Sequence, residues 1–253
     1  LGFNGLTDEI VKIAKENDLL LIEDCCESHG ATFKGQHVGT IGDMSCFSFY
    51  FGHHMTTIEG GMISTDNEEI YELARMFRSH GMTREASVKT HEKYSKKDVN
   101  PLFTFAVPGY NMRSSEINAV LGIEQLKRLD YNISIRQKNL HTWLSNLDPE
   151  IYFVDFDVEG SSNYALPLIL NKNYKKMNEV CSILKKEGVE YRLGTAGGGN
   201  QARQPYLERY DFKVCGELDV SNYIHDYGLY IGNHPELKEE DIIYLCNKLN
   251  FRG

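Results

Sequence analysis

Two polar segments of this 253-residue chain hold the residue types that do chemistry. The first is IEDCCESHGA, residues 22–31, in which two acids follow a short apolar run. A carboxylate at the end of a buried strand is costly to keep charged unless a partner neutralises it. Asp24 would therefore suit a protonated heterocycle nitrogen, although a helix N-cap or a loop salt bridge would explain the same carboxylate.

The second segment is GDMSCFSFYFGHHMTTIEGG, residues 42–61. Within it, Ser48 lies in an expected strand and can offer its hydroxyl to a phosphate. The adjacent His53 and His54 fit a solvated loop. Zinc binding is a third interpretation, but adjacent histidines lack the i, i+4 spacing of a helical metal pair, so we expect no metal site.

The elements that must position these segments are those of an α/β sheet. Thr7 is expected to cap a helix that extends to about Asn17, with acids in its first turn. The run LLLI at 19–22 is continuously apolar, which is typical of a strand buried on both faces. Because this strand ends at Glu23 and Asp24, the acids lie at its carboxyl end, where open parallel sheets bind ligands.

Further elements are expected on both sides of the histidine loop. Two strands are predicted at 45–51 and 61–64, with a polar loop at 53–59 between them. Asp66 is expected to cap a helix that reaches about Ser79 and stops at Gly81. Residues 83–108 are polar and irregular. A long helical pattern then starts at Ser114 or Ser115, breaks near residue 130 and resumes to about residue 147.

A change in the residue pattern after Pro149 predicts a second domain. A strand at 164–170, a helix at 174–187, a strand at 189–191 and a closing helix at 239–249 follow, and this alternation is typical of a smaller α/β unit. The glycine cluster at 194–199 lacks the strand-to-helix setting of a phosphate loop, so we expect a mobile loop there. We therefore predict a large domain over 1–148 and a small C-terminal domain over 149–253.

Composition excludes several classes of function. A formal charge of −9 argues against a nucleic-acid binder, which needs a basic face. No apolar run approaches the roughly 20 residues of a membrane span, and no signal peptide is visible. The six cysteines form no CxxC pair. We interpret them as reduced and mostly buried thiols of a cytoplasmic protein.

Taken together, the motifs resemble those of the DegT/DnrJ/EryC1/StrS family of sugar aminotransferases. The family pattern is EDxAQxHGA, GDxxxFSFxxxKxxxxxEGG, RxHG and GxNxR, which stand here at 23–31, 42–61, 78–81 and 109–113. The segment GNHP at 232–235 is also similar to the C-terminal site segment of the family. The resemblance covers essentially the whole chain. It implies an α/β, fold-type I, aspartate aminotransferase-like fold that depends on pyridoxal 5′-phosphate (PLP).

Residue by residue, the resemblance implies a cofactor site. Asp24 would bind the pyridine nitrogen and Ser48 the phosphate, while Glu27 takes the place of a glutamine near the ring hydroxyl. Asn111 would reach the phosphate of a neighbouring subunit's cofactor, which implies a homodimer with a shared site. Family members are considerably longer at the N-terminus, so we expect further parts of the large domain to lie outside this chain.

His53 occupies the position of the family's cofactor-binding lysine. Imidazole cannot hold the cofactor's aldehyde covalently, but its usual pKa of about 6.5 suits a base near neutral pH. The resemblance therefore implies a resting pyridoxamine 5′-phosphate (PMP) form and a dehydration in place of a transamination. Such 3-dehydratases remove the C3 hydroxyl of a nucleotide-linked 4-keto-6-deoxysugar and release ammonia, and L-glutamate restores PMP. His80 is a candidate for assisting the departure of the hydroxyl, or else a helix C-cap residue.

Some 3-dehydratases of the family carry a [2Fe–2S] cluster whose cysteines follow the histidine motif. No cysteine lies between Cys46 and Cys181. The resemblance therefore implies the cluster-free kind, which takes a GDP-linked sugar and serves colitose synthesis for lipopolysaccharide O-antigen. Two alternatives stay open, namely a sugar aminotransferase whose lysine was replaced and a non-catalytic member that lost it.

Overall fold

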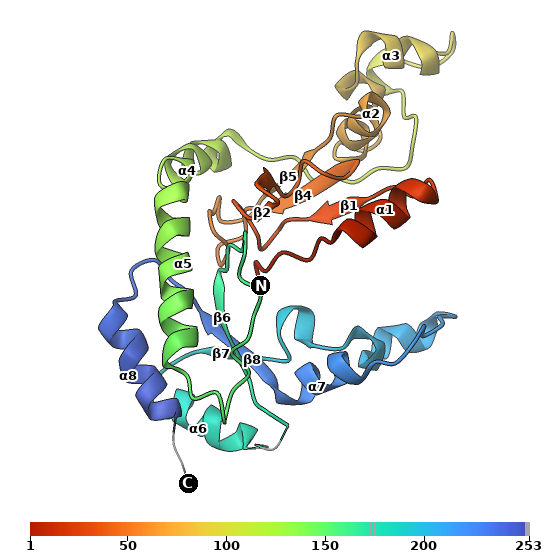
Figure 1. Ribbon diagram of the computed structural model, residues 1–253. Helices are drawn as coiled ribbons and strands as arrows, with labels where there is room; N and C mark the ends of the chain where they lie inside the picture. Colours follow the sequence, from red (N-terminus) through yellow and green to blue (C-terminus); the bar gives the residue numbers. More distant parts are fainter. Residues whose placement is uncertain (173, 175, 251–253) are drawn as a thin grey trace. The chain divides into compact units, whose positions relative to one another are not determined.

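Residues 1–172, 174 and 176–250 are described by the computed structural model, in which the chain divides into two units (Figure 1). Unit 1 consists of Leu1–Phe3 and Tyr131–Gly253, and unit 2 consists of Asn4–Asp130. The predicted boundary after residue 148 follows the long helix α5 (Leu129–Asn146), whereas the two units divide in the first turn of that helix. The reason is that Leu140 and Trp143 of α5 pack into the core of unit 1.

Unit 2 is built on a three-stranded sheet with the order β1-β4-β5. β1 (Ile22–Asp24) runs parallel to β4 (Met44–Ser48), and β4 runs antiparallel to β5 (Gly61–Ser64). A small hairpin of β2 (Thr32–Phe33) and β3 (Gln36–His37) lies between β1 and β4 in the chain. Because β1 and β4 are parallel, their carboxyl ends share one edge of the sheet, as the sequence predicted for the acids.

Side-chain caps define most of the helices of unit 2. α1 (Asp8–Glu16) begins after Thr7, whose hydroxyl accepts the N–H of Ile10, as predicted. α2 (Glu68–Phe77) is capped by Asn67 and not by the predicted Asp66, because the amide oxygen of Asn67 accepts the N–H groups of Glu69 and Ile70. The break near residue 130 is real, since α4 (Glu116–Leu126), capped by Ser115, ends before α5 begins.

Only Ile22 of the apolar run at 19–22 lies in a strand. The N–H of Leu19 donates to Ala14 O and so still closes the end of α1, and the N–H of Leu21 donates to the Asp43 side chain. β1 therefore begins only at Ile22. Leu19 and Leu20 are exposed, and the buried residue of β1 is Glu23. The prediction of a strand buried on both apolar faces was wrong.

Residues 83–108 contain more helix than expected. α3 (Val88–Tyr94) is capped by Ser87, and short 3₁₀ turns occupy Thr83–Glu85 and Pro101–Phe103. The polar composition of this stretch hid the helix, because α3 buries no residue and so shows no apolar stripe.

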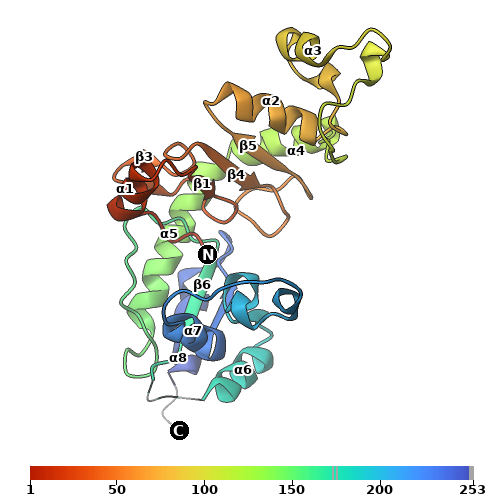
Figure 2. The same cartoon turned by 90° about the vertical axis from the view of Figure 1, so that its right-hand side faces the viewer.

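Unit 1 pairs three antiparallel strands with helices (Figures 1 and 2). Its sheet has the order β6-β8-β7, with β6 at Ala165–Ile169, β7 at Tyr191–Leu193 and β8 at Gly228–Gly232. Its further helices are α6 (Met177–Lys186), α7 (Asp219–Tyr227) and α8 (Glu239–Leu249). α8 has its predicted bounds, whereas α7 and β8 were not predicted.

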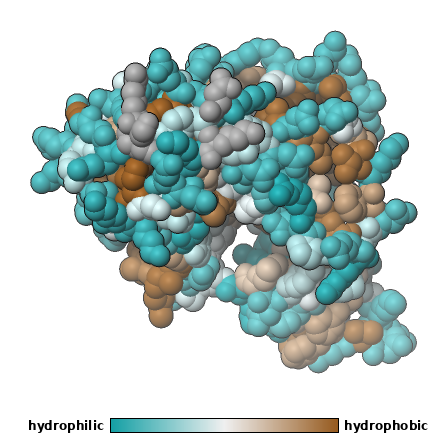
Figure 3. Space-filling model, turned by 90° about the horizontal axis from the view of Figure 1, so that it is seen from below, coloured by the Kyte–Doolittle hydropathy of each residue, from teal (hydrophilic) through white to brown (hydrophobic). Residues whose placement is uncertain are grey.

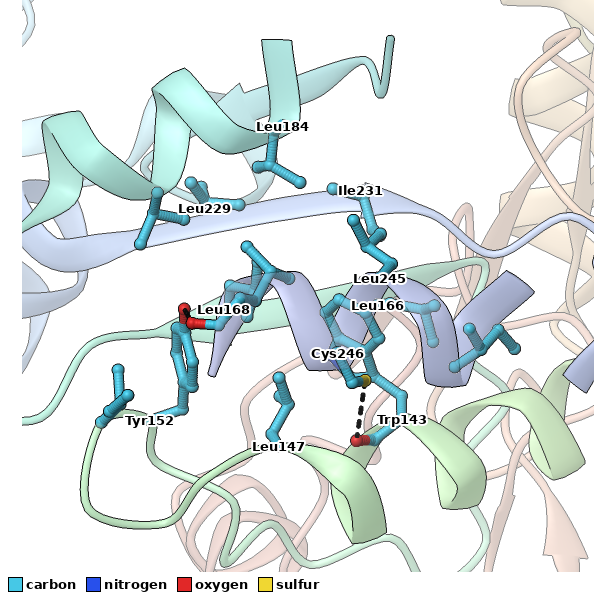
Figure 4. Packing of buried hydrophobic residues seen from close by; sticks show 14 of the residues in the cluster. Trp143, Leu147, Tyr152, Leu166, Leu168, Leu184, Leu229, Ile231, Leu245 and Cys246 are labelled. Atoms are coloured by element: carbon cyan, nitrogen blue, oxygen red, sulfur yellow. Dashed lines mark hydrogen bonds between the residues drawn. The ribbon is translucent and has the colours of Figure 1, made fainter. Parts of the chain in front are cut away.

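The core of unit 1 gathers side chains from its sheet, α5, α6 and α8 (Figure 4). Trp143 is fully buried, and its indole N–H donates to Pro167 O at 2.8 Å. Cys246 lies beside it, with Sγ 3.9 Å from Trp143 O. Burial raises the pKa of Cys246 to about 12, so this thiol behaves as a small apolar residue, as expected.

Apolar side chains also remain on the surface, where Figure 3 shows hydrophobic patches among hydrophilic residues. All six cysteines are free thiols, and Cys215 is exposed. Among the described residues, no helix combines the length and the apolar character that crossing a membrane requires.

Candidate active site

The buried carboxylate of Glu23 fixes the turn that leads into β4. Its side chain accepts three main-chain hydrogen bonds, from Gly39 N at 2.6 Å, Ile41 N at 2.8 Å and Gly42 N at 2.7 Å. These donors satisfy a charge that would otherwise be costly at 6% exposure. Glu23 is therefore a structural residue, and it ties the end of β1 to the approach of β4.

Asp24 ends β1 on the opposite face and is exposed. Its Oδ1 accepts the N–H of Cys26 at 3.1 Å, and its Cα lies opposite that of Cys46 in the parallel register. Burial, followed by the hydrogen bond to Asp24, raises the pKa of Cys26 to about 12. The thiol beside Asp24 thus stays protonated, and Asp24 supplies the negative charge at this point of the sheet edge.

Ser48 ends β4 at the same edge and starts the loop that carries the histidines. Its Oγ accepts the N–H of Tyr50 at 3.2 Å, and the N–H of His53 donates to Tyr50 O at 3.1 Å. The two bonds form successive tight turns. They bring the half-buried ring of His53 into an edge contact with the ring of Tyr50, at 5.4 Å between centroids.

The electrostatics of His53 show what lies around its ring. Burial lowers the pKa of His53, whereas the carboxylates of Glu27 and Asp24 and a hydrogen bond with the main chain of Ser48 act in the opposite direction. The structure thus brings together Asp24, Glu27, Ser48 and His53, the four residues that the sequence analysis placed in one site. The resulting group has a base that is neutral at physiological pH beside two acids.

His29 belongs to the same group, although the sequence analysis gave it no role. It is 4% exposed, and its ring contacts those of Phe47, Phe49 and His54 at centroid distances of 5.5, 6.0 and 5.4 Å. Burial, together with the charge of His53, lowers the pKa of His29 to about 4. The available signal was its place in the quoted motif HGA, but a motif alone does not tell which histidines are buried together.

His80 and Asn111 form a second group within unit 2. The N–H of His80 donates to Tyr110 O at 2.6 Å, and Ser79 and Asn111 face each other in an isolated antiparallel bridge. His80 adopts a left-handed φ of 60° and is exposed, as is Asn111. The Nε–H of Arg113 donates to Asn111 Oδ1 at 3.4 Å. Both side chains are therefore accessible. The C-cap of α2 is Arg78, so His80 follows the helix without being the C-cap residue of its alternative interpretation.

The GNHP segment of unit 1 is held by a buried polar network that comes from α5. Arg136 donates from Nη1 to Asn233 O at 2.5 Å, and Asn139 donates to Asn233 Oδ1 at 3.1 Å. Burial lowers the pKa of the Arg136 guanidinium to about 10. The next residue, His234, is exposed, and its Nδ1 accepts the N–H of Glu236 at 3.2 Å. Because Nδ1 accepts this bond, the proton of a neutral His234 ring lies on Nε2.

The polar groups around His53 fit a phosphorylated, protonated heterocycle. A carboxylate at a strand end matches a ring cation, a serine hydroxyl at the neighbouring strand end matches a phosphate, and imidazole supplies a base. Within residues 1–172, 174 and 176–250, no three His, Cys, Asp or Glu side chains are grouped so that they could hold a metal ion.

Comparison with known proteins places these observations in a family. Residues 4–250 match the model of the DegT/DnrJ/EryC1/StrS aminotransferase family. The GDP-4-keto-6-deoxy-D-mannose 3-dehydratase of Escherichia coli O55:H7 is 36% identical over 249 residues, which cover 97% of this chain and 64% of that protein. The chain thus spans less than two thirds of the length of this curated relative.

Solved structures give the same answer for the fold. A structure of the E. coli GDP-4-keto-6-deoxy-D-mannose 3-dehydratase with bound hydrated PLP has a TM-score of 0.89 at 36% identity, covering 98% of this chain and 65% of that chain. A structure of a GDP-4-keto-6-deoxymannose 3-dehydratase with a trapped PLP–glutamate geminal diamine has a TM-score of 0.90 at 35% identity, with the same coverage. The predicted α/β, aminotransferase-like fold is confirmed.

Proposed function

Because the chain belongs to the DegT/DnrJ/EryC1/StrS aminotransferase family, we propose that it is a PLP- and PMP-dependent nucleotide-sugar 3-dehydratase. The proposed substrate is GDP-4-keto-6-deoxy-D-mannose, which loses its C3 hydroxyl, and L-glutamate is the proposed amino donor. The observation that carries the proposal is the imidazole of His53, which takes the place of the family's lysine. The carboxylates of Glu27 and Asp24 lie close enough to raise its pKa against the lowering effect of burial.

The residues at the β1–β4 edge would hold the cofactor. Asp24 would bind the pyridinium nitrogen, Ser48 would bind the phosphate, and Glu27 would lie near the ring hydroxyl. When bound, the cofactor supplies an electron sink and, in its amine form, the amino group that joins the ketosugar. The two carboxylates keep this edge negative, which favours the protonated ring.

His53 would act as the base of the reaction. It has no primary amine with which to hold the cofactor's aldehyde, so it stays available for proton transfer. Its depressed pKa keeps the ring neutral near pH 7, the form that takes a proton from C4′ of the amine cofactor. His80, exposed at the end of α2, would assist the departing hydroxyl.

The finer parts of the proposal concern the cellular setting. We propose that the product serves colitose and O-antigen synthesis, and that the reaction takes place in the cytoplasm, where the six free thiols stay reduced. We also propose a homodimer, in which the exposed Asn111 reaches the cofactor phosphate of the second subunit.

The direct test is turnover of GDP-4-keto-6-deoxymannose with L-glutamate and saturating PLP. We expect release of ammonia and 2-oxoglutarate, and a sugar product that has lost the elements of water by mass spectrometry. CDP- and dTDP-linked 4-ketosugars, run in parallel, determine the nucleotide preference. An inactive protein that still binds PLP would support a non-catalytic member and would overturn the dehydratase.

Two variants of His53 separate the remaining alternatives. His53→Asn should keep the absorbance of bound cofactor and lose deoxygenation, since the amide cannot accept the proton. His53→Lys restores the family's lysine. Brisk sugar amination by this variant, with no dehydration by the unmodified protein, would favour an aminotransferase whose lysine was replaced.

A further inference from the structure

The loop that carries His53 is closed on itself by main-chain hydrogen bonds. The N–H of Thr57 donates to Phe49 O at 2.9 Å, and the N–H of Phe49 donates to Gly60 O at 2.8 Å. The stretch from Phe49 to Gly60 therefore leaves β4 and returns to β5 through one turn at 57–60. The position of His53 depends on where this turn is fixed.

The turn contains a strained residue. Ile58 has a left-handed φ of 73°, which a β-branched side chain rarely adopts, and its side chain is 63% exposed. Burial of Ile58 thus cannot offset the strain. The N–H of Ile58 donates to Thr56 Oγ1 at 2.8 Å, and Thr57 Oγ1 donates to Glu59 O at 2.7 Å. Such a conformation persists only where the surroundings hold it.

Asn118 of α4 holds this turn from a position far away in sequence. Its Nδ2 donates to Thr57 O at 2.7 Å and to Glu59 O at 3.3 Å, so one amide bridges the two carbonyls on either side of Ile58. Thr57 is 5% exposed, and the shorter bond, to its carbonyl, is partly buried, whereas the longer bond to Glu59 O is exposed.

The surface of α4 is also shaped to receive the turn. One helical turn after Asn118 stands Gly122, and a Cβ added there would come within 3.1 Å of Thr57 Cγ2. The same added Cβ would lie 4.0 Å from Met55 Cε. The small residue thus lets Thr57 approach α4 closely enough for its carbonyl to meet the amide of Asn118.

We propose that Asn118 is a positioning residue for His53, acting through the 57–60 turn. It touches none of the reacting atoms, and its amide fixes the left-handed conformation of Ile58 and hence the return of the loop to β5. The inference rests on the proposed function only in taking His53 as the base. The positioning itself is a property of the chain that is measurable without turnover.

The decisive variant is Asn118→Asp. The Oδ1 of Asn118 accepts the N–H of Ser115 at 3.3 Å and its hydroxyl at 2.5 Å, and aspartate keeps these acceptor roles at the start of α4. It loses both donors to the turn and places a carboxylate against two carbonyls. The matched control is Ser115→Ala, which removes the capping hydroxyl and leaves the two donors of Asn118 in place.

Two measurements that need no turnover test the positioning. In Asn118→Asp we expect the amides of Phe49 and Thr57 to exchange with solvent about tenfold faster or more. The carboxylate repels the two carbonyls and no longer holds the strained turn, so the turn opens locally more often. We also expect the ring resonances of isotope-labelled His53 to shift and their titration midpoint to change. Ser115→Ala should leave exchange at these amides and the His53 resonances as in the unmodified protein, with only α4 less stable.

Turnover by the PLP-loaded protein gives the third measurement. For Asn118→Asp we expect kcat to fall by about 10- to 100-fold, the scale of a small misplacement of a catalytic group, with KM little changed. Ile58→Gly added to Asn118→Asp should recover part of this loss, because glycine adopts the left-handed conformation without strain.

The outcomes are separable from those of the proposed function. Unchanged exchange and His53 resonances in Asn118→Asp would overturn the positioning role. So would equal changes in Ser115→Ala, which would assign the effect to the stability of α4. If the unmodified protein catalyses no dehydration while the exchange and resonance changes occur as expected, the proposed function fails and the positioning of His53 stands.

Discussion

Ser79 and Asn111 face each other across an isolated antiparallel bridge, and this bridge joins two motifs that are separate in the sequence. On one side of it, the N–H of Tyr110 donates to Phe77 O at 2.7 Å, and on the other the N–H of Met112 donates to Arg78 O at 2.8 Å. The segments RSHG and GYNMR therefore form one structural element. His80 and Asn111 are presented together because their backbones are paired.

Glycine makes this pairing feasible, which gives a first prediction. A Cβ added at Gly81, where φ is 80°, would lie 1.7 Å from Val107 O. Gly81→Ala should destabilise unit 2 by at least about 1–3 kcal/mol, from the left-handed backbone alone, as measured by urea denaturation. Gly5→Ala is the control, because a Cβ there meets nothing within 4 Å. Equal stability of the two variants would contradict the close approach.

The second prediction concerns Glu23. Glu23→Gln replaces one acceptor oxygen of the carboxylate with an NH₂ donor, which then faces main-chain N–H groups. At least one of the three hydrogen bonds to this buried side chain is therefore lost. We expect a loss of about 1–3 kcal/mol in the free energy of unfolding. Glu92→Gln, at an exposed glutamate of α3, should stay within about 0.5 kcal/mol of the unmodified protein. A similarly small effect at Glu23 would argue against its role in fixing the turn.

The third prediction concerns the pH dependence of turnover. The negative charge of Glu27 raises the pKa of His53 against the lowering effect of burial. Glu27→Gln removes that charge, so the pKa of His53 should fall further. Because the neutral ring is the base, the acidic limb of the profile of kcat/KM against pH should move to lower pH. Glu92→Gln should leave the limb in place, and a limb that moves to higher pH in Glu27→Gln would contradict the assignment of His53 as the base.

The fourth prediction concerns stability in acid. The pKa of His29 is about 4 in the folded protein, below its ordinary value of 6.5. At pH values between these two pKa values, His29 is protonated in the unfolded chain and neutral in the folded chain. The free energy of unfolding therefore decreases as the pH falls from 6.5 towards 4. The loss should reach about 3 kcal/mol. Denaturation of His29→Gln at several pH values should show a flatter dependence in this window, and an unchanged slope would contradict the burial of a neutral ring.

Local chemistry made some elements predictable. Thr7 and its following acids define α1, and the apolar spacing of α8 defines its bounds. The strand at 61–64 follows from its composition and was found there. By contrast, the apolar run at 19–22 misled, since Leu19 closes the end of α1 and only Ile22 joins the sheet. β8 was missed because its five residues, GLYIG, contain two glycines and give a weak strand signal.

The sequence by itself determined the chemistry available: a carboxylate at Asp24, a hydroxyl at Ser48, and an imidazole at His53 in place of an amine. These follow from residue types in an ordered set of motifs. Only the tertiary structure decided which of them meet and in what state, because burial and neighbouring charges set the pKa values of His53 and His29. The same holds for Asn118, which reaches Thr57 across 61 residues of sequence, since no local pattern encodes a contact between distant segments.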